Sequence, residues 1–237
     1  MKKVLFVLIV LSIFFSGCDL FMKKQLEADN TVEVKELKPD SVKTTGQLID
    51  TLLTQKVRPH IHSWLSHYKI DIDSFLLVAE RRFNLDSLNH KDNPYYSDFT
   101  EEGVRYVPEL RDYSPDKKRY VGLIEAMYPY LGEDGKYHFG GSDDSQPIRL
   151  VDTAEKRSVL ISFRGINDFA DAVFWIDDTT FALVGYSTID EIFRYTLEIY
   201  DLEREQLARY ELADENSQSF RSYILDDMLF RGIIIDN

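Results

Sequence analysis

Short runs that alternate apolar and polar residues, separated by Asp-rich turns, dominate the second half of the chain. The clearest lies over 174–212, where β-branched and aromatic residues are interrupted by polar tips. Alternation with a period of two is typical of strands with one buried face, and short polar turns join antiparallel neighbours. Residues 181–184 are apolar throughout, which predicts a strand covered on both faces. The pattern therefore predicts an antiparallel β domain over residues 91–237.

Two segments of this domain repeat one plan. The strands expected in the first segment are 109–113, 119–126, 147–152 and 157–163. In the second, 175–181 matches the first hairpin, and 197–201 matches 148–152 at an offset of 49 residues. Two more strands, 220–225 and 228–235, would form half of a third unit. Such antiparallel meander units resemble propeller blades, but they are too few for a closed propeller, which needs about four or more.

Two apolar features of these units carry further expectations. We expect Trp175 to be buried between layers of strands. The run 230–235 is β-rich, nearly uncharged and close to the chain end. A bare strand edge of this kind promotes aggregation, so we expect it to be paired. The sequence leaves open whether it pairs inside the domain or with a strand of a partner.

Residues 47–90 are predicted to form an N-terminal helical region. Leucines recur at helical spacing between Leu48 and Leu53. Pro59 suits the first turn of a second short helix. The segment 74–83 is compatible with a helix or a strand, and we favour the helix because Asp or Ser at its start can act as a cap. The expected fold is therefore mainly β with a small helical region before it.

Residues 1–17 have the pattern of a secretory signal peptide. Lys2 and Lys3 are followed by the 12-residue apolar run 4–15 and then by small residues. That run is shorter than the roughly 20 residues that span a bilayer as a helix. We therefore expect this segment to be removed from the mature protein.

Cys18 is the only cysteine of the chain and directly follows the small residues. This arrangement resembles the bacterial lipobox, which implies that Cys18 is lipidated and becomes the mature N-terminus. A plain signal peptide with an incidental cysteine is the alternative. Residues 18–46 lack the hydrophobic density of a core and are expected to form a flexible tether. The resemblance implies a membrane partner, reached through the N-terminal lipid anchor.

Composition and charge narrow the classes of partner. Hydrophobic residues make up 44% of the chain, which allows an ordinary globular core. The chain has 41 acidic and 28 basic residues, a formal net charge of −13. Phosphate binding needs clustered Lys and Arg, so this balance argues against a nucleic-acid partner.

Several motifs in the β part carry a family resemblance. They are 113–116 (Tyr-Ser-Pro-Asp), 148–153 (Ile-Arg-Leu-Val-Asp-Thr) and 172–175 (Ala-Val-Phe-Trp), the last followed by Val-Gly at 184–185. With these motifs, residues 105–202 resemble a group of uncharacterised bacterial lipoproteins with propeller-blade-like repeats. The motifs are turn and core residues, so the resemblance implies a fold and brings no activity with it.

Residues that could carry chemistry are sparse. His60, His62 and His67 are spaced so that no helical face gathers all of them, which favours surface histidines over a metal site. Adjacent acid pairs at 143–144, 177–178 and 226–227 are expected at hairpin tips, where Asp side chains stabilise turns. The chain has no Gly-rich phosphate loop, nucleophile elbow or zinc-protease helix motif. We therefore assign no catalytic residue, cofactor or metal ligand.

One insertion stands out between matched strands of the first unit. Residues 127–146 replace a much shorter connection, 187–194, in the second unit. Tyr and Gly at a loop tip are typical of recognition surfaces, because aromatic rings give contact area at little entropic cost. The candidate binding residues are Tyr128, Tyr130, Tyr137, His138 and Phe139. The alternative is a hairpin that turns at 133–136 and packs its own aromatic side chains.

These observations predict a lipoprotein of a bacterial cell envelope, periplasmic or surface-exposed. The expected function is a non-enzymatic binding or assembly module with a protein or glycan partner. The alternative is an envelope hydrolase acting on glycans. A convergent acid pair beside an aromatic platform in a cleft would favour the hydrolase. A flat or edge-exposed surface without such a pair would favour binding.

Overall fold

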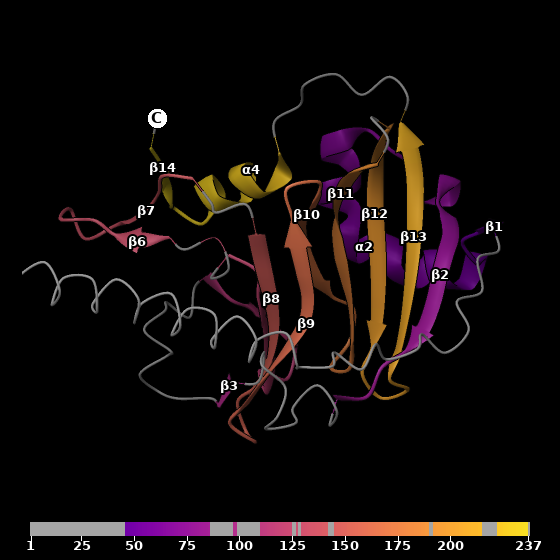
Figure 1. Ribbon diagram of the computed structural model, residues 1–237, viewed down its shortest axis with the longest axis horizontal. Coiled ribbons are helices and arrows are strands. Elements are labelled where there is room, and N and C mark those ends of the chain that lie inside the picture. The colour runs from indigo at the N-terminus through magenta and orange to yellow at the C-terminus, as the bar shows by residue number, and fades with distance from the viewer. Residues whose placement is uncertain are drawn as a thin grey trace, which may run out of the picture. The chain divides into compact units, whose positions relative to one another are not determined.

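The computed structural model of the chain (Figure 1) describes residues 46–85, 97–98, 110–124, 127, 129–141, 145–189, 192–214 and 222–236. All of them belong to the unit Asp40–Asn237. Of the residues that can be interpreted, 49% lie in strands and 21% are helical, so this unit is mainly β. The signal peptide, Cys18 and nearly all of the tether lie outside the described residues and stay predictions.

The larger sheet has six strands in the order β1-β2-β13-β12-β11-β10, and all neighbours are antiparallel. Four of its strands follow one another along the chain: β10 (Asp168–Trp175), β11 (Thr180–Ile189), β12 (Ile192–Asp201) and β13 (Gln206–Asp214). β2 (Leu76–Arg82) and β1 (Gln47–Leu48) extend the sheet beyond β13. The expected hairpin over 175–181 and the strand 197–201 are therefore confirmed.

The second sheet has five strands in the order β3-β9-β8-β5-β4, again antiparallel. Their bounds are β3 (Ser97–Asp98), β4 (Asp112–Tyr113), β5 (Arg119–Gly122), β8 (Ser145–Asp152) and β9 (Arg157–Gly165). β8 and β9 confirm the strands expected over 147–152 and 157–163. β4 and β5 are shorter than expected. The turn between them is held as expected, because Ser114 Oγ donates to Asp116 Oδ1 at 2.8 Å.

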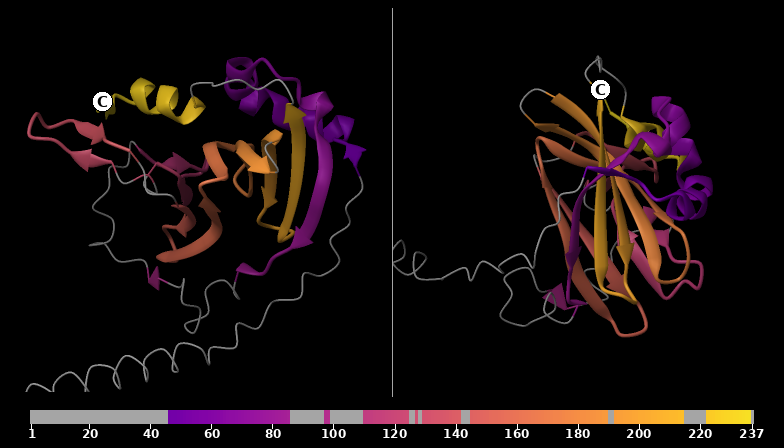
Figure 2. Two further views of the ribbon diagram at one scale, coloured as in Figure 1. Left: turned by 45° about the horizontal axis from the view of Figure 1, so that its top comes forward. Right: turned by 90° about the vertical axis from the view of Figure 1, so that its right-hand side faces the viewer.

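Two hydrophobic cores define the layers. Val121 and Leu150 of the five-stranded sheet lie in one core with Phe181 and Leu183 of the six-stranded sheet. The opposite face of the six-stranded sheet packs against helix α2 (Thr51–Tyr68), as Figure 2 shows. Strand β11 therefore lies between two cores, which confirms the prediction that residues 181–184 are covered on both faces.

The N-terminal helical region is smaller than expected and differs in form. α2 is one continuous helix with Pro59 in its interior, so the prediction of two short helices is wrong. Asp50 begins the helix, and its carboxylate accepts hydrogen bonds from Leu52 N and Leu53 N at 2.8 and 3.2 Å. The apolar stripe through Val57, Ile61 and Trp64 continues across the proline, and burial of that stripe outweighs the local penalty.

Most of the segment 74–83 forms strand β2 (Leu76–Arg82), so the helix favoured from the sequence is wrong. A single turn of 3₁₀ helix over Ile72–Ser74 precedes β2. β2 pairs with β13 over Leu76–Arg82, with one register shift, and β1 pairs with its other edge. Pairing on both edges supplies backbone hydrogen bonds to strands far away in sequence, and this overrides the local helix signals.

The C-terminal segment, by contrast, is mainly helical where strands were expected. α4 (Tyr223–Phe230) replaces the strands expected over 220–225 and 228–235, which are therefore wrong. Ile224 and Met228 lie four residues apart on one helix face and are buried in the core between the sheets. Only β14 (Ile234–Ile235) is a strand, and it pairs in parallel with β7 (Tyr137–Phe139). Of the run 230–235, only Ile234 and Ile235 therefore pair as a strand, and they do so inside the domain.

The two tryptophans of the chain differ in burial. Trp175 is partly buried rather than fully covered, and its Nε1 donates to Asp112 O at 2.7 Å. Trp64 on α2 is instead the fully buried tryptophan.

Within the part of the chain that the structure describes, neither helix has the length and apolar character needed to span a membrane.

Candidate functional site

The aromatic insertion folds into a hairpin of β6 (Tyr130–Leu131) and β7, to which β14 adds as a third strand. Gly132 N donates to Lys136 O at 2.8 Å, and Gly135 has a φ of +77°, so the chain turns where the sequence predicts it. Figures 1 and 2 show this hairpin extending away from both larger sheets. β6 is the outer strand, so one of its edges makes no strand pairing with the described residues.

The candidate binding residues do not share one surface. Phe139 is 6% exposed and belongs to the core between the sheets, and Tyr137 packs partly against the same core. Tyr130 is 51% exposed and its neighbour Leu131 is 61% exposed. Tyr128 lies outside the described residues. The surface of the hairpin therefore depends on Tyr130, Leu131 and His138.

Tyr130 and His138 are held in place by carboxylates from two other segments. Tyr130 OH donates to Asp236 Oδ2 at 2.5 Å, and His138 Nδ1 lies 2.9 Å from Asp236 Oδ1. His138 Nε2 lies 3.2 Å from Asp134 Oδ1 in the turn. The Tyr130 and His138 rings are stacked, with centroids 5.5 Å apart and planes at 26°. The aromatic pair is therefore fixed to the segment after β14.

These contacts change the proton affinities of the groups. Hydrogen bonds to Asp236 and Asp134 raise the pKa of His138 above its ordinary value. The hydrogen bond from His138 lowers the pKa of Asp236, and a backbone hydrogen bond from Lys136 followed by the contact with His138 lowers that of Asp134. His138 is thus stabilised as a cation between two ionised carboxylates.

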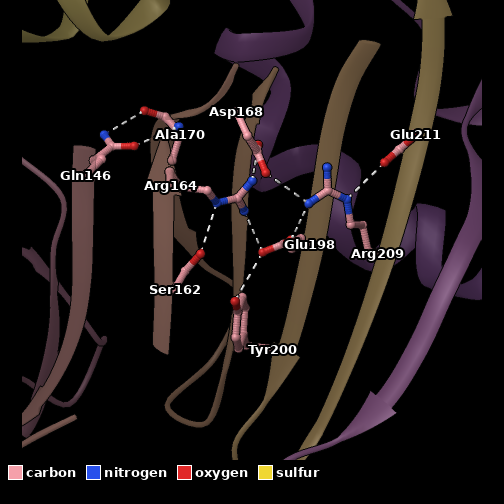
Figure 3. A network of polar contacts seen from close by, with 9 residues as sticks. All are labelled: Gln146, Ser162, Arg164, Asp168, Ala170, Glu198, Tyr200, Arg209 and Glu211. Atoms are coloured by element: carbon pink, nitrogen blue, oxygen red, sulfur yellow. Dashed lines mark hydrogen bonds and ion pairs between the residues drawn. The ribbon is translucent and has the colours of Figure 1, made fainter. Parts of the chain in front are cut away.

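A second polar cluster is buried between the sheets (Figure 3). Arg164 of β9 is 3% exposed and lies 2.7 Å from Glu198 of β12, whose side chain is 5% exposed. Its Nε donates to Ser162 Oγ at 2.9 Å, and its Nη1 also donates to Asp168 of β10. Each of the three guanidinium nitrogens of Arg164 therefore has an oxygen partner.

Arg209 of β13 completes this ion-pair network. Its Nη1 donates to Glu198 Oε1 at 3.2 Å and to Asp168 Oδ2 at 3.4 Å, and its Nε donates to Glu211 at 3.0 Å. Burial by itself lowers the pKa of Arg209, but the carboxylates outweigh it and the pKa is raised. Burial and the Glu198 charge raise the pKa of Tyr200, whose hydroxyl donates to Glu198 at 3.1 Å. The network is saturated by its own members, which indicates a structural link between sheets.

A third polar site joins the helices to the six-stranded sheet. Asp171 lies at an irregularity of β10, between Ala170 and Ala172, and is fully buried on the α2 side. It accepts hydrogen bonds from Trp64 Nε1 at 3.2 Å, Tyr68 OH at 2.8 Å and Ser222 Oγ at 2.7 Å. Burial raises the pKa of Asp171 despite these donors. The site therefore links α2, β10 and the start of α4.

The described acid pairs and histidines form no group that could hold a metal ion. Asp177 lies at a hairpin tip as expected, where Thr179 N donates to Oδ1 at 3.0 Å. The pair 226–227 lies in α4, so its predicted place at a hairpin tip is wrong, and 143–144 is outside the described residues. Among the described residues, no three His, Cys, Asp or Glu side chains could hold a metal ion.

A cleft of about 340 Å³ opens near the turns, between the two larger sheets. The described residues that line it include Asp152 and Glu203, but no aromatic residue. Asp152 already accepts hydrogen bonds from Ala154 N and Glu155 N, and it lies 3.1 Å from Arg119 Nε. The cleft therefore lacks the acid pair beside an aromatic platform that a glycan hydrolase needs.

Sequence reasoning missed Arg164, Asp171 and Glu198. Each interrupts an otherwise apolar or alternating strand at an inward-facing position, and that interruption was the available signal.

Comparison with known proteins adds no assignment. No protein-family model, no curated protein and no solved structure matches this chain.

Proposed function

We propose that this protein is a lipid-anchored binding module of a bacterial cell envelope, and that hairpin β6–β7 contacts its partner. The observation that carries this proposal is the exposed pair Tyr130 and Leu131 on the outer strand of the hairpin. Exposed aromatic and aliphatic side chains that are already ordered lose little entropy on binding.

The edge of β6 that pairs with none of the described strands favours a protein partner over a glycan. An extended segment of another chain can add to such an edge through backbone hydrogen bonds, while Tyr130 and Leu131 give contacts on opposite faces. This mode needs no catalytic group, in keeping with the saturated polar clusters elsewhere. Binding is favoured over glycan hydrolysis because the described lining of the cleft between the two larger sheets has no aromatic residue beside its acids.

The same proposal gives the two larger sheets a structural role. We interpret β4-β5-β8-β9 and β10-β11-β12-β13 as two propeller-like blade units, too few to close into a ring. α2 then covers the face of the second unit that another blade would cover in a propeller. The units form a support from which the hairpin extends.

The anchor rests on the lipobox-like sequence around Cys18. Attached acyl chains would supply the membrane affinity that the acidic protein surface lacks. We therefore expect Cys18→Ser to remain uncleaved or to leave the membrane fraction. Retention of correctly cleaved Cys18→Ser protein in the membrane fraction would contradict the anchor.

The partner contact is tested by photo-crosslinking of the full chain in its own envelope. A benzoylphenylalanine replaces Leu131 in one variant and Phe163 of β9 in the control, because both side chains are 61% exposed. We expect a discrete protein adduct from position 131 that position 163 does not give. The further substitution Tyr130→Ala should reduce that adduct about tenfold, as expected for the loss of an aromatic anchor worth 1–2 kcal/mol. Equal adducts from both positions, or none from position 131, would exclude the hairpin as the binding site.

A further inference from the structure

We propose that His138 is a proton-operated clamp, which in its protonated form fastens the C-terminal strand β14 to hairpin β6–β7 and loosens that strand when it loses the proton. The clamp is a property of the chain alone. Its consequence, that pH sets when the hairpin is competent to bind, rests on the proposed function.

The geometry requires two protons on the imidazole. Nδ1 faces Asp236 at 2.9 Å and Nε2 faces Asp134 at 3.2 Å, so each ring nitrogen has its own carboxylate. A neutral imidazole has one donor and one acceptor, whereas the cation has two donors. Loss of one proton therefore leaves one of the two carboxylates facing the lone pair of a ring nitrogen, and that hydrogen bond is lost.

Asp236 is the point at which the C-terminal segment is fastened. Its carboxylate binds Tyr130 and His138, and its backbone N donates to Phe139 O at 2.9 Å. β14 itself has only the residues Ile234 and Ile235. Such a short ladder supplies few backbone hydrogen bonds, so the side-chain contacts of Asp236 form a large share of the polar attachment, beside the packing of Ile235 against the core.

The ring of His138 packs closely against the backbone of Gly132 in the turn. A Cβ placed on Gly132 would lie 2.7 Å from both Cδ2 and Nε2 of His138, and 2.9 Å from Asp134 Oδ1. These distances are below van der Waals contact. Glycine at position 132 thus allows the imidazole to reach Asp134, which gives a way to disturb the clamp without removing a charge.

The surrounding groups set the pH range. Asp134 faces His138 from the turn, Asp236 from the segment after β14 and the Tyr130 phenol from β6, while Lys136 donates its backbone N–H to Asp134. The two carboxylates raise the pKa of His138 above about 6.5, its value in an unfolded chain. The clamp's contribution is thus complete below about pH 6.5 and is lost as the pH rises through the raised value.

The titration of His138 in the full chain, followed by NMR of its imidazole, tests the clamp directly. We expect a midpoint above about 6.5, and a lower midpoint in Asp236→Asn, because the nearest carboxylate charge is lost. Gly132→Ala should lower the midpoint as well, since it displaces the ring. His62→Gln, at an exposed position of α2, is the control and should leave the midpoint of His138 unchanged.

Amide hydrogen exchange of residues 234–236, corrected for intrinsic rates, measures the fastening of β14. We expect protection to fall across the His138 titration in the natural chain and to be independent of pH in His138→Gln. A midpoint at or below about 6.5, or the same pH dependence in His138→Gln, would overturn the clamp whatever the hairpin binds. If the clamp titrates but the adduct at position 131 forms equally at pH values on both sides of the midpoint, the regulatory consequence is wrong and the proposed function is untouched.

Discussion

Buried polar residues of this protein act mainly as links between elements, and Asp171 is the clearest example. Its carboxylate is fully buried and receives side-chain donors from α2 and from the residue before α4. An acceptor in this position costs free energy unless donors surround it. The three donors therefore fix where α2 and α4 lie on β10.

Tyr68 allows this link to be weakened without loss of packing. Its hydroxyl donates to Asp171 Oδ2 and accepts from Tyr223 N at 2.9 Å. Tyr68→Phe keeps the ring but removes one of the three side-chain donors of buried Asp171 and the acceptor of Tyr223 N, so we expect a loss of about 1–3 kcal/mol in the free energy of unfolding. Urea denaturation measures it. Tyr223→Phe, which removes only an exposed contact with Ser63 Oγ, should change stability far less. Equal losses would show that the Asp171 site is not the cause.

At the scale of elements, the sequence predicted those whose signals are local. The hairpins at Asp116 and Asp177 depend on turn chemistry, and the burial of residues 181–184 on both faces depends on their apolar side chains. Both features were therefore predictable. α4 was missed because the apolar residues of 220–235 fit a strand as well as a helix. The seven-residue strand β2 was missed because its partners β13 and β1 are distant in sequence.

The candidate site was predictable only in part, for a similar reason. The sequence located the hairpin and its turn, because Tyr, Gly and Asp have local preferences there. It did not predict Asp236, which reaches Tyr130 and His138 across a sequence separation of about a hundred residues. Nor did it predict the fate of Phe139, whose burial depends on how the hairpin base meets the core between the sheets.

Gly185 tests the close approach of β10 and β11. A Cβ at this position would lie 2.0 Å from Phe169 O, which belongs to the backbone of the paired strand. Gly185→Ala must therefore push the strands apart beside the irregularity at Asp171, and we expect a loss of about 3 kcal/mol. Gly165→Ala is the matched control, because a Cβ there meets nothing within 4 Å. Similar urea midpoints for the two variants would contradict this packing.

At the scale of the described unit, the two larger sheets are joined by apolar packing and by charge. The core between them provides the non-directional attraction. Arg164, on β9 of one sheet, reaches Glu198 on β12 of the other, and this contact has a defined geometry. The ion-pair network therefore helps to align the sheets, because it adds a contact of defined geometry to apolar packing that is non-directional.

We expect substitutions at Arg164 and Glu198 to destabilise the protein less together than the sum of their single effects would suggest. Arg164→Met leaves Glu198 and Asp168 with only Arg209 as a cation, and we expect a loss of about 3–5 kcal/mol. Replacing Glu198 by Met as well removes the uncompensated charge. The double variant should therefore recover about 2–3 kcal/mol relative to the sum of the single effects.

Urea denaturation of the four proteins of this double-mutant cycle measures the coupling between the two residues. Arg58→Met is the surface control, because its ion pairs with Asp71 and Asp73 are largely exposed and should contribute less than about 1 kcal/mol. Additive losses in the cycle would show that Arg164 and Glu198 act independently. The ion-pair network would then not align the sheets, since its remaining charges, Asp168, Arg209 and Glu211, all lie on the six-stranded sheet.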